Sequence, residues 1–139
     1  MLSAPIRNAT SRRSANDEQV YDALRKSPRP MSAYEILGAL KGSHIKAAVQ
    51  VYRALERLMA GNRVHRIESR NAFVACSCAA HSTPAGFYIC ESCGAAYEFD
   101  PGPVLGAMRP AAAGFEVQQA SIELRGLCLD CGAKGARPA

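Results

Sequence analysis

The chain has 139 residues, 48% of them hydrophobic, and a formal net charge of +5. This length allows one or two small domains, and no apolar run is long enough to span a membrane. Residues 1–80 hold 13 Lys and Arg against 6 Asp and Glu, whereas residues 81–139 hold 4 against 6. We therefore expect a basic first module that binds a polyanion, most simply nucleic acid, and a second module with a different task. The first ten residues do not resemble an export signal, so we expect a cytoplasmic protein.

The first forty residues predict an arm and two helices. Residues 1–14 are basic and polar without apolar periodicity, which predicts a mobile arm that could add phosphate contacts. A first helix is expected from the capping residue Asn16 to about Lys26. Ser32 and Glu35 have the spacing of a capping box, so a second helix should begin there.

A third helix is predicted from apolar residues that recur at intervals of three and four. Its buried stripe is expected to comprise Ile45, Ala48, Val49, Tyr52, Leu55 and Met59. The opposite face aligns Lys46, Gln50, Arg53 and Arg57. Such a face is often merely solvated. In a basic module after two short helices, however, it favours a recognition helix in a major groove, with Arg53 reading a base edge and Tyr52 beside it.

Two short strands are expected after the third helix. Val64–Ile67 and Ala72–Ala75 flank a turn around Arg70, and they complete a winged helix-turn-helix. Arg63, Arg66 and Arg70 would place positive charge on this wing.

Two copies of Cys-x-x-Cys-Gly indicate a metal site. Cys90 and Cys93 form one knuckle, Cys128 and Cys131 the other, and such a pair is typical of structural zinc held by four thiolates. The glycine after each knuckle should allow a left-handed backbone. Two disulfides are the main alternative, but so short a loop would strain them. A redox Cys-x-x-Cys is normally single and lies in a βαβ setting, which is not seen here.

The residues around the knuckles predict a small α/β unit. We expect strands at Phe87–Cys90 and Ala96–Phe99, a short helix from Pro103, and a last strand over Phe115–Leu124 with a bend near Gln119. So few elements bury too little apolar surface, so zinc and a partner subunit should supply the deficit.

These elements define an α+β fold with two modules. A winged-helix DNA-binding domain is followed by a small α/β dimerisation domain that contains a structural zinc site of four cysteines. The predicted boundaries are an arm at 1–14, the winged helix at 15–75, a hinge at 76–86, the dimerisation domain at 87–133 and a tail at 134–139.

Three further segments carry a resemblance. Together with the paired knuckles, Ser-Ala-Tyr-Glu-Ile-Leu at 32–37, Val-Tyr-Arg-Ala-Leu at 51–55 and Val-His-Arg-Ile-Glu-Ser at 64–69 resemble the ferric uptake regulator (Fur) family of bacterial metal-sensing repressors, most of all its zinc uptake branch. The resemblance implies a homodimer that binds a double-stranded DNA operator with an inverted repeat when loaded with metal, and so represses zinc-uptake genes. It implies neither an enzymatic activity nor a small-molecule substrate.

The resemblance also implies two zinc ions per chain. The structural ion would be held by the knuckle cysteines, and the regulatory ion by His65, Cys76, His81 and Glu98. Two imidazoles, a thiolate and a carboxylate form a closed tetrahedral set for zinc. The chain departs from the family pattern at 81–83, where His-Ser-Thr replaces His-x-His, and at Gln50, where relatives often have threonine. Cys78 could be a ligand, a redox-sensitive thiol or a small apolar residue.

Other functions are compatible with parts of this pattern. A regulator of the same family could respond to iron, manganese or peroxide, although the soft thiolate of Cys76 disfavours hard metals. A zinc hydrolase would need an open coordination position and a base, and the chain has no His-Glu-x-x-His. A zinc-ribbon adaptor without DNA binding would not need the basic face of the third helix.

Overall fold

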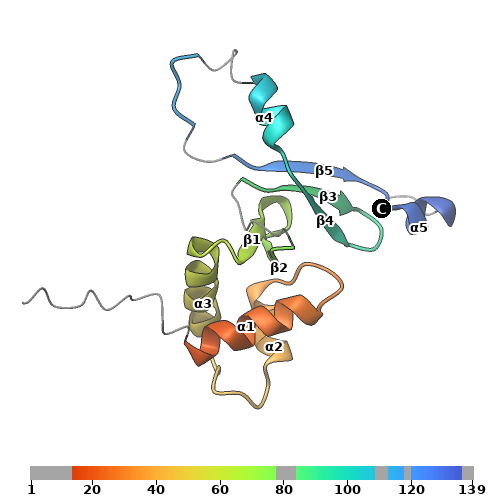
Figure 1. Cartoon of the computed structure of the whole chain (residues 1–139). Helices are drawn as coiled ribbons and strands as arrows, with labels where there is room; N and C mark the ends of the chain where they lie inside the picture. Colours follow the sequence, from red (N-terminus) through yellow and green to blue (C-terminus); the bar gives the residue numbers. More distant parts are fainter. Residues whose placement is uncertain (1–13, 78–83, 109–112, 118–119, 136–139) are drawn as a thin grey trace, which may run out of the picture.

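The computed structural model describes residues 14–77, 84–108, 113–117 and 120–135, and it places two modules one above the other (Figure 1). Three helices and a hairpin form the first module, and a three-stranded sheet with two helices forms the second. Among the described helices, none is both long and apolar enough to cross a membrane. The predicted arm lies outside the described residues except for Ser14.

The first two helices begin at side-chain caps. Helix α1 spans Ala15–Lys26, and its cap is Ser14 rather than the expected Asn16, because the Ser14 side chain accepts a hydrogen bond from the Asp17 amide. Helix α2 spans Ala33–Ala39, and its predicted capping box is confirmed. The Ser32 amide donates to Glu35 Oε2 at 2.7 Å, while the Glu35 amide donates to the Ser32 hydroxyl at 3.2 Å.

Helix α3 spans Ala48–Ala60 and is rotated relative to the expected orientation. The side chains of Val49 and Tyr52 are 52% and 39% exposed, so their assignment to the buried stripe is wrong. The helix begins only at Ala48, and its inward face comprises Val51, Ala54, Leu55 and Leu58. Ile45 is buried as expected, but it lies before the helix.

The wing is a hairpin with the predicted bounds. Strand β1 (Val64–Ile67) pairs antiparallel with β2 (Ala72–Ala75) across the short 3-10 helix η2 at Glu68–Arg70. Phe73 also exchanges two backbone hydrogen bonds with Met31, of 2.8 and 3.0 Å. The wing is thereby attached to the segment between α1 and α2. All three helices and the wing contribute to one buried core: Val20, Leu24, Ala33, Ile36, Ile45, Val51, Ala54, Leu55, Leu58, Val64 and Phe73.

The sheet of the second module has the order β4-β3-β5. Strand β3 (Gly86–Cys90) pairs antiparallel with β4 (Ala96–Phe99) and parallel with β5 (Ile122–Gly126). Helix α4 (Gly102–Met108) lies in the connection from β4 to β5, which leads from one edge of the sheet to the other.

The last strand was predicted to begin too early. Phe115 is 74% exposed and precedes the strand, which begins only at Ile122. The change in apolar phase within Phe115–Leu124 therefore does not mark a bulge inside one long strand. Part of the expected bend, residues 118–119, lies outside the described residues.

The two modules meet where the wing packs on the sheet. Ile67 of β1 forms a buried cluster with Phe87 and Ile89 of β3, and Val74 of β2 packs against it. This apolar contact places β1 and β2 beneath the sheet (Figure 1). It therefore fixes which residues of the wing can meet residues of the second module.

Candidate metal centres and DNA-binding face

The four knuckle cysteines converge on one point at an end of the sheet. Their sulfur atoms all lie within 4.8 Å of one another: Cys90, Cys93, Cys128 and Cys131. The Cys93 and Cys128 sulfurs are 3.9 Å apart, and the Cys128 amide donates to Cys90 Sγ at 3.4 Å. Four thiols in one cluster match the closed tetrahedral set of structural zinc. All four cysteines are free thiols, so the disulfide alternative is not supported.

The two knuckles differ in their backbone. Gly94 has φ of 78°, the left-handed conformation expected after a knuckle. Gly132 does not adopt it, because the second knuckle starts helix α5 (Leu129–Ala133) with Cys128 as its N-cap residue. The turn that ends this helix contains Gly135, with φ of 68°.

The electrostatics of the cluster favour a bound cation. Hydrogen bonds from backbone amides, first that of Cys93 and then that of Cys128, outweigh burial and lower the pKa of Cys90 to about 6. Ser92 would lower the pKa of Cys131, but the neighbouring thiols and burial raise it to about 11. One thiolate therefore forms readily while a further one is opposed. A divalent cation removes this conflict by neutralising the shared charge.

A second cluster joins the two modules. His65 on β1, Cys76 after β2 and Glu98 on β4 bring their ligand atoms within 4.8 Å of one another. His65 Nε2 lies 3.4 Å from Glu98 Oε1, and the Cys76 thiol donates to that same oxygen at 3.6 Å. His65 and Cys76 are each 8% exposed. An imidazole, a thiolate and a carboxylate that face one another supply three of the four ligands that a tetrahedral zinc site needs.

Each ligand of this cluster is held by its surroundings. The Cys76 amide donates to the Arg63 carbonyl at 2.8 Å, which continues the pairing of the wing strands. The His65 ring packs against Phe87 with centroids 5.8 Å apart. Ser77 donates to Glu98 Oε2 through its amide at 2.9 Å and its hydroxyl at 3.0 Å. Glu98 Oε1 therefore stays directed at His65 and Cys76.

Sequence reasoning did not identify Ser77, because a serine beside Cys76 carries no signal of its own until the strand with Glu98 is placed above it. His81, the fourth predicted ligand, and Cys78 both lie outside the described residues. The prediction for His81 therefore stays a prediction.

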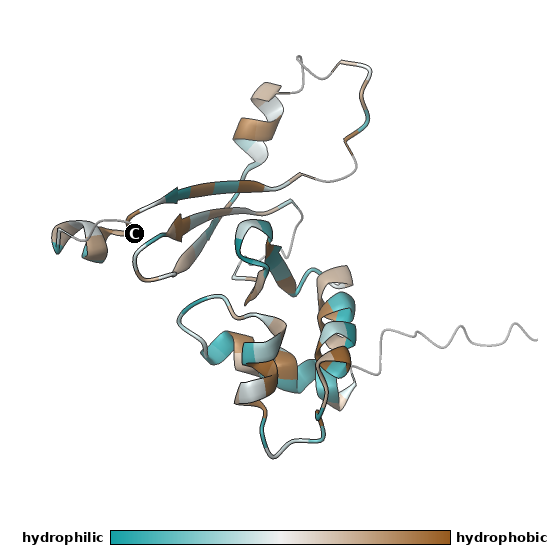
Figure 2. Cartoon of the chain, turned by 180° about the vertical axis from the view of Figure 1, so that it is seen from behind, coloured by the Kyte–Doolittle hydropathy of each residue, from teal (hydrophilic) through white to brown (hydrophobic). Residues whose placement is uncertain are grey.

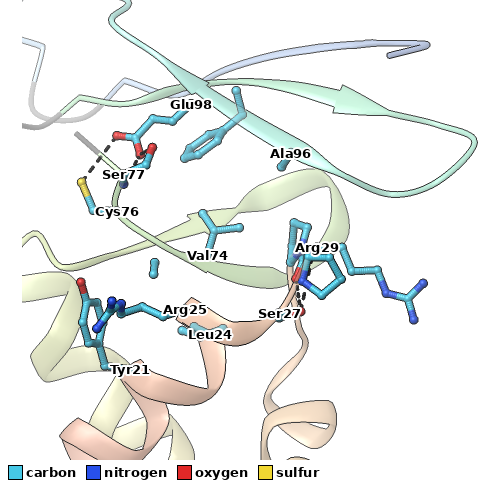
Figure 3. Close-up of a pocket in the computed structure, with 14 residues that line it drawn as sticks. Tyr21, Leu24, Arg25, Ser27, Arg29, Val74, Cys76, Ser77, Ala96 and Glu98 are labelled. Carbon is cyan, nitrogen blue, oxygen red and sulfur yellow. Dashed lines mark hydrogen bonds between the residues drawn. The ribbon is translucent and has the colours of Figure 1, made fainter. Parts of the chain in front are cut away.

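A cleft of about 280 Å³ opens between the corner after α1 and the sheet. Cys76, Ser77 and Glu98 line one side of it, whereas Arg25 and Arg29 lie toward the other (Figure 3). Two of the clustered ligands are therefore accessible from this cleft although the cluster itself is largely buried.

The predicted DNA-contacting residues divide into two groups. Tyr52 and Arg53 are exposed on α3, and Lys46 is exposed just before it. Gln50 instead accepts hydrogen bonds from the amides of Lys46 and Ala47 at 2.7 and 3.1 Å, so its side chain caps the N-terminus of α3. Lys46, Arg53 and Arg57 are exposed as expected, but Lys46 precedes the helix and the Gln50 side chain binds backbone amides. The four side chains therefore do not form one line along α3.

Arg57 of α3 forms an ion pair with α1 inside the first module. Its guanidinium binds both oxygens of Asp17 on α1, with a shortest contact of 2.7 Å, and the Asp17 side chain is 8% exposed. The hydrogen bond to Asp17 raises the pKa of Arg57 above its ordinary value. Similarly, Arg63 binds Glu18 at 2.8 Å and lies 3.9 Å from the centre of the Tyr21 ring. Much of the guanidinium charge expected on Arg57 and Arg63 is therefore neutralised by α1.

The two modules and their ligand clusters together indicate the class of protein. A winged helix joined to an α/β module with four clustered cysteines, and a ligand cluster shared by both modules, is the arrangement of a winged-helix regulator with two metal centres. No protein-family model matches the chain. Its relatives and structural neighbours define the family.

Two curated relatives are the zinc uptake regulation proteins of Escherichia coli (strain K12) and Shigella flexneri. Each is 36% identical over 105 residues, which cover 73% of this chain and 61% of the relative. The chain thus matches less than two thirds of their length. Among solved structures, a zinc uptake regulator complexed with zinc and DNA aligns with a TM-score of 0.80 and 30% identity, over 88% of this chain and 84% of the other.

Holo XcZur aligns with a TM-score of 0.78 and 34% identity over 86% of both chains. A ferric uptake regulator from Francisella tularensis with iron is 17% identical and shares the fold, with a TM-score of 0.59 over 86% of this chain and 92% of the other. The chain belongs to the Fur family and is similar to its zinc uptake regulators.

Proposed function

We propose that the protein is a zinc-responsive transcriptional repressor that binds an inverted-repeat operator as a metal-loaded dimer and controls zinc-uptake genes. The observation that carries this proposal is the cluster of His65, Cys76 and Glu98, because its ligands come from both modules. A regulator of this family is not an enzyme. The relative solved with zinc and DNA supports the same conclusion by similarity.

The chemistry of the cluster favours zinc over a hard metal. The soft thiolate of Cys76 suits zinc better than manganese, and the fourth position is proposed for His81. When bound, zinc would cross-link donors of the wing to a donor of the second module. Glu98 and His65 would thereby hold the two modules in one relative orientation. Without zinc, the modules would exchange between this orientation and others. To shift that equilibrium from about 1:99 to 99:1, zinc must bind the favoured orientation more tightly by roughly 5.5 kcal/mol.

The DNA contacts are proposed for the start of α3. Lys46 would neutralise a phosphate, Arg53 would read a base edge, and Tyr52 would contact the neighbouring base or support the helix. The relevant side chains of Tyr52 and Arg53 are exposed, which supports this assignment. Gln50 and Arg57 have intramolecular partners, so we propose that they position the helix and contribute little to base recognition.

A second copy of the chain is proposed to cover the outer face of the sheet. Tyr88 pairs directly with Tyr97 and with Leu124, so the three side chains share one face, and they are 52%, 53% and 47% exposed. Apolar and polar residues alternate along β5 (Figure 2), and α4 adds exposed Val104 and Met108. Contiguous apolar surface of this kind is typical of an interface. The family resemblance supports a homodimer.

The dimer is tested with Leu124→Glu, which places a charge on this face. Sedimentation velocity should give a monomer for the variant and a dimer for the wild type. Leu124 is 47% exposed and its replacement leaves the four knuckle cysteines in place to hold the second module, so the monomer should keep its fold. A variant that sediments as a dimer would assign the interface to another surface.

The finer organisation is part of the same proposal. We propose domain limits at 15–75 and 87–133 with a hinge at 76–86 between them, and we place the repressor in the cytoplasm together with its operator. The wing strands end at Ala75 and the sheet begins at Gly86, in agreement with these limits.

The test of the function is a metal-resolved DNA-binding assay. A duplex is first selected from a random library with the zinc-loaded protein. The protein is then treated with a mild chelator, and zinc, iron or manganese is returned. We expect chelation to abolish binding while about one zinc per chain remains, and zinc alone to restore it. Restoration by iron or manganese would instead support a sensor of those metals.

A further inference from the structure

Three residues form a row across the sheet and face the wing. In the strand register, Phe87 of β3 lies opposite Glu98 of β4 on one side and opposite Glu123 of β5 on the other. Directly paired residues share one face of a sheet. Phe87 packs against Ile67 of the wing, so all three side chains are on the face that covers it.

The two carboxylates at the ends of this row meet opposite ends of the wing. Glu98 meets His65 and the residues after β2, at the base of the hairpin. Glu123 meets the tip, where the Ser69 amide donates to its two oxygens at 3.2 and 3.3 Å. The buried Ile67 and Phe87 lie between these contacts. The sheet therefore contacts the wing at three points: Glu98 at its base, Glu123 at its tip and an apolar contact between them.

The charge of Glu123 is stabilised in place. Burial would raise its pKa, but hydrogen bonds from Ser69 and from the Glu68 amide, together with Arg125, hold the pKa below its ordinary value. The side chain is half-buried. A carboxylate in this setting makes a stronger hydrogen bond than a neutral acceptor would.

We propose that Glu123 is a positioning residue for the metal centre: it latches the tip of the wing onto β5 and thereby keeps His65 and Cys76 facing Glu98. This inference rests on the proposed function. Glu123 is not a metal ligand, and its contact with Ser69 needs neither His65 nor Cys76. Its effect on metal binding is therefore indirect.

The expected loss of zinc affinity depends on the fraction of zinc-free molecules in which His65, Cys76 and Glu98 already face one another. The apparent dissociation constant of the site rises in proportion as that fraction falls. Loss of one charge-assisted hydrogen bond at a half-buried position, with the apolar contact retained, should weaken zinc binding about three- to tenfold. The four-cysteine site should be unaffected, because all of its ligands lie in the second module.

The experiment compares Glu123→Ala and Glu123→Gln with the wild type and with a charge-matched control. Asp22→Asn removes the same charge from an exposed position on α1. Zinc is titrated against a chromophoric chelator into protein that retains one zinc per chain, without DNA. Hydrogen exchange of the peptide that covers the wing tip is measured on the same samples, and thermal unfolding reports stability.

We expect Glu123→Ala to weaken the second zinc site and to speed exchange at the wing tip, with Glu123→Gln intermediate and Asp22→Asn unchanged. Zinc affinity of Glu123→Ala equal to that of the wild type overturns the latch while the proposed function stands. A wild type that takes up only one zinc per chain overturns the proposed function itself. A global loss of stability in Glu123→Ala, with equal loss of affinity in Glu123→Gln, would contradict a local positioning role.

Discussion

The two modules differ in how they are held together. The first buries a continuous apolar core beneath three capped helices and reinforces it with ion pairs between α1 and α3 or the wing. In the second, the buried apolar side chains among the described residues are Phe87, Ile89, Cys90 and Pro101, and the wing contributes Ile67 to the cluster of Phe87 and Ile89. The first module can be stabilised by its own packing, whereas the second has too little.

This difference explains where the ligand clusters lie. The four cysteines are in the module with the sparse core, so a metal there would replace missing apolar contacts. The cluster of His65, Cys76 and Glu98 lies between the modules, where a bound metal would fix their relative orientation. We therefore propose that one centre serves stability and the other regulation.

The largest effect is expected from the stabilising centre. Cys93→Ser removes one of four thiolates and should unfold the second module, because structural zinc contributes on the order of 10 to 16 kcal/mol of apparent binding free energy in small domains. Circular dichroism and zinc content would report the loss. The first module should still unfold cooperatively on heating. A variant that keeps both its sheet and one zinc per chain would contradict the division between the modules.

An intermediate effect is expected in the first module. Arg57→Ala leaves the buried carboxylate of Asp17 without its main partner, which should lower the free energy of unfolding by about 1 to 3 kcal/mol. Denaturant unfolding of the variant, compared with that of the wild type, gives this value.

Arg53→Ala is the matched control on the same helix. Since Arg53 is exposed, its loss should leave stability within about 0.5 kcal/mol of the wild type. It should instead remove about 1 to 3 kcal/mol of discrimination between the selected duplex and a mismatched one. If Arg57→Ala reduced discrimination and Arg53→Ala reduced stability, the two arginines would have the opposite roles.

The smallest effect concerns the capping box of α2. The amide and the hydroxyl of Ser32 hold the pKa of Glu35 below its ordinary value. The ionised carboxylate therefore contributes stability above the ordinary pKa of glutamate, and this is lost as the pH falls through the lower folded-state pKa. Because Glu35 is exposed, Glu35→Gln should cost only a few tenths of a kcal/mol at neutral pH. The difference from the wild type should vanish in acid, and a pH-independent difference would contradict this account.

Local signals in the sequence predicted most of the fold. The capping box at Ser32 and the bounds of both wing strands follow from short-range chemistry, and the repeated Cys-x-x-Cys spacing predicted that the two knuckles meet. All three predictions are confirmed. The predictions were wrong where contacts between distant segments determine the local structure. The Ser14 cap joins the network of Asp17 and Arg57, which links two helices far apart in sequence.

The candidate site divides in the same way. The cysteines were found by their spacing, and His65, Cys76 and Glu98 through a family resemblance. Ser77 and Glu123 carry no local signal, because their roles depend on the register of β4 and β5 and on the docking of the wing. Gln50 and Arg57 are predicted to contact DNA from helical periodicity, which cannot show that a side chain also has a partner within the protein. Their contacts with DNA stay predictions.

The central claim is that the cluster shared by the modules couples zinc to DNA, and Cys76→Ser tests it most directly. The variant keeps all four knuckle cysteines, so it should remain folded with one zinc per chain. Zinc is titrated into the wild type and the variant with and without the selected duplex. In the wild type, DNA should tighten zinc binding by the same factor by which zinc tightens DNA binding. In Cys76→Ser we expect the zinc dependence of DNA affinity to be largely lost, and an undiminished zinc response would contradict the account.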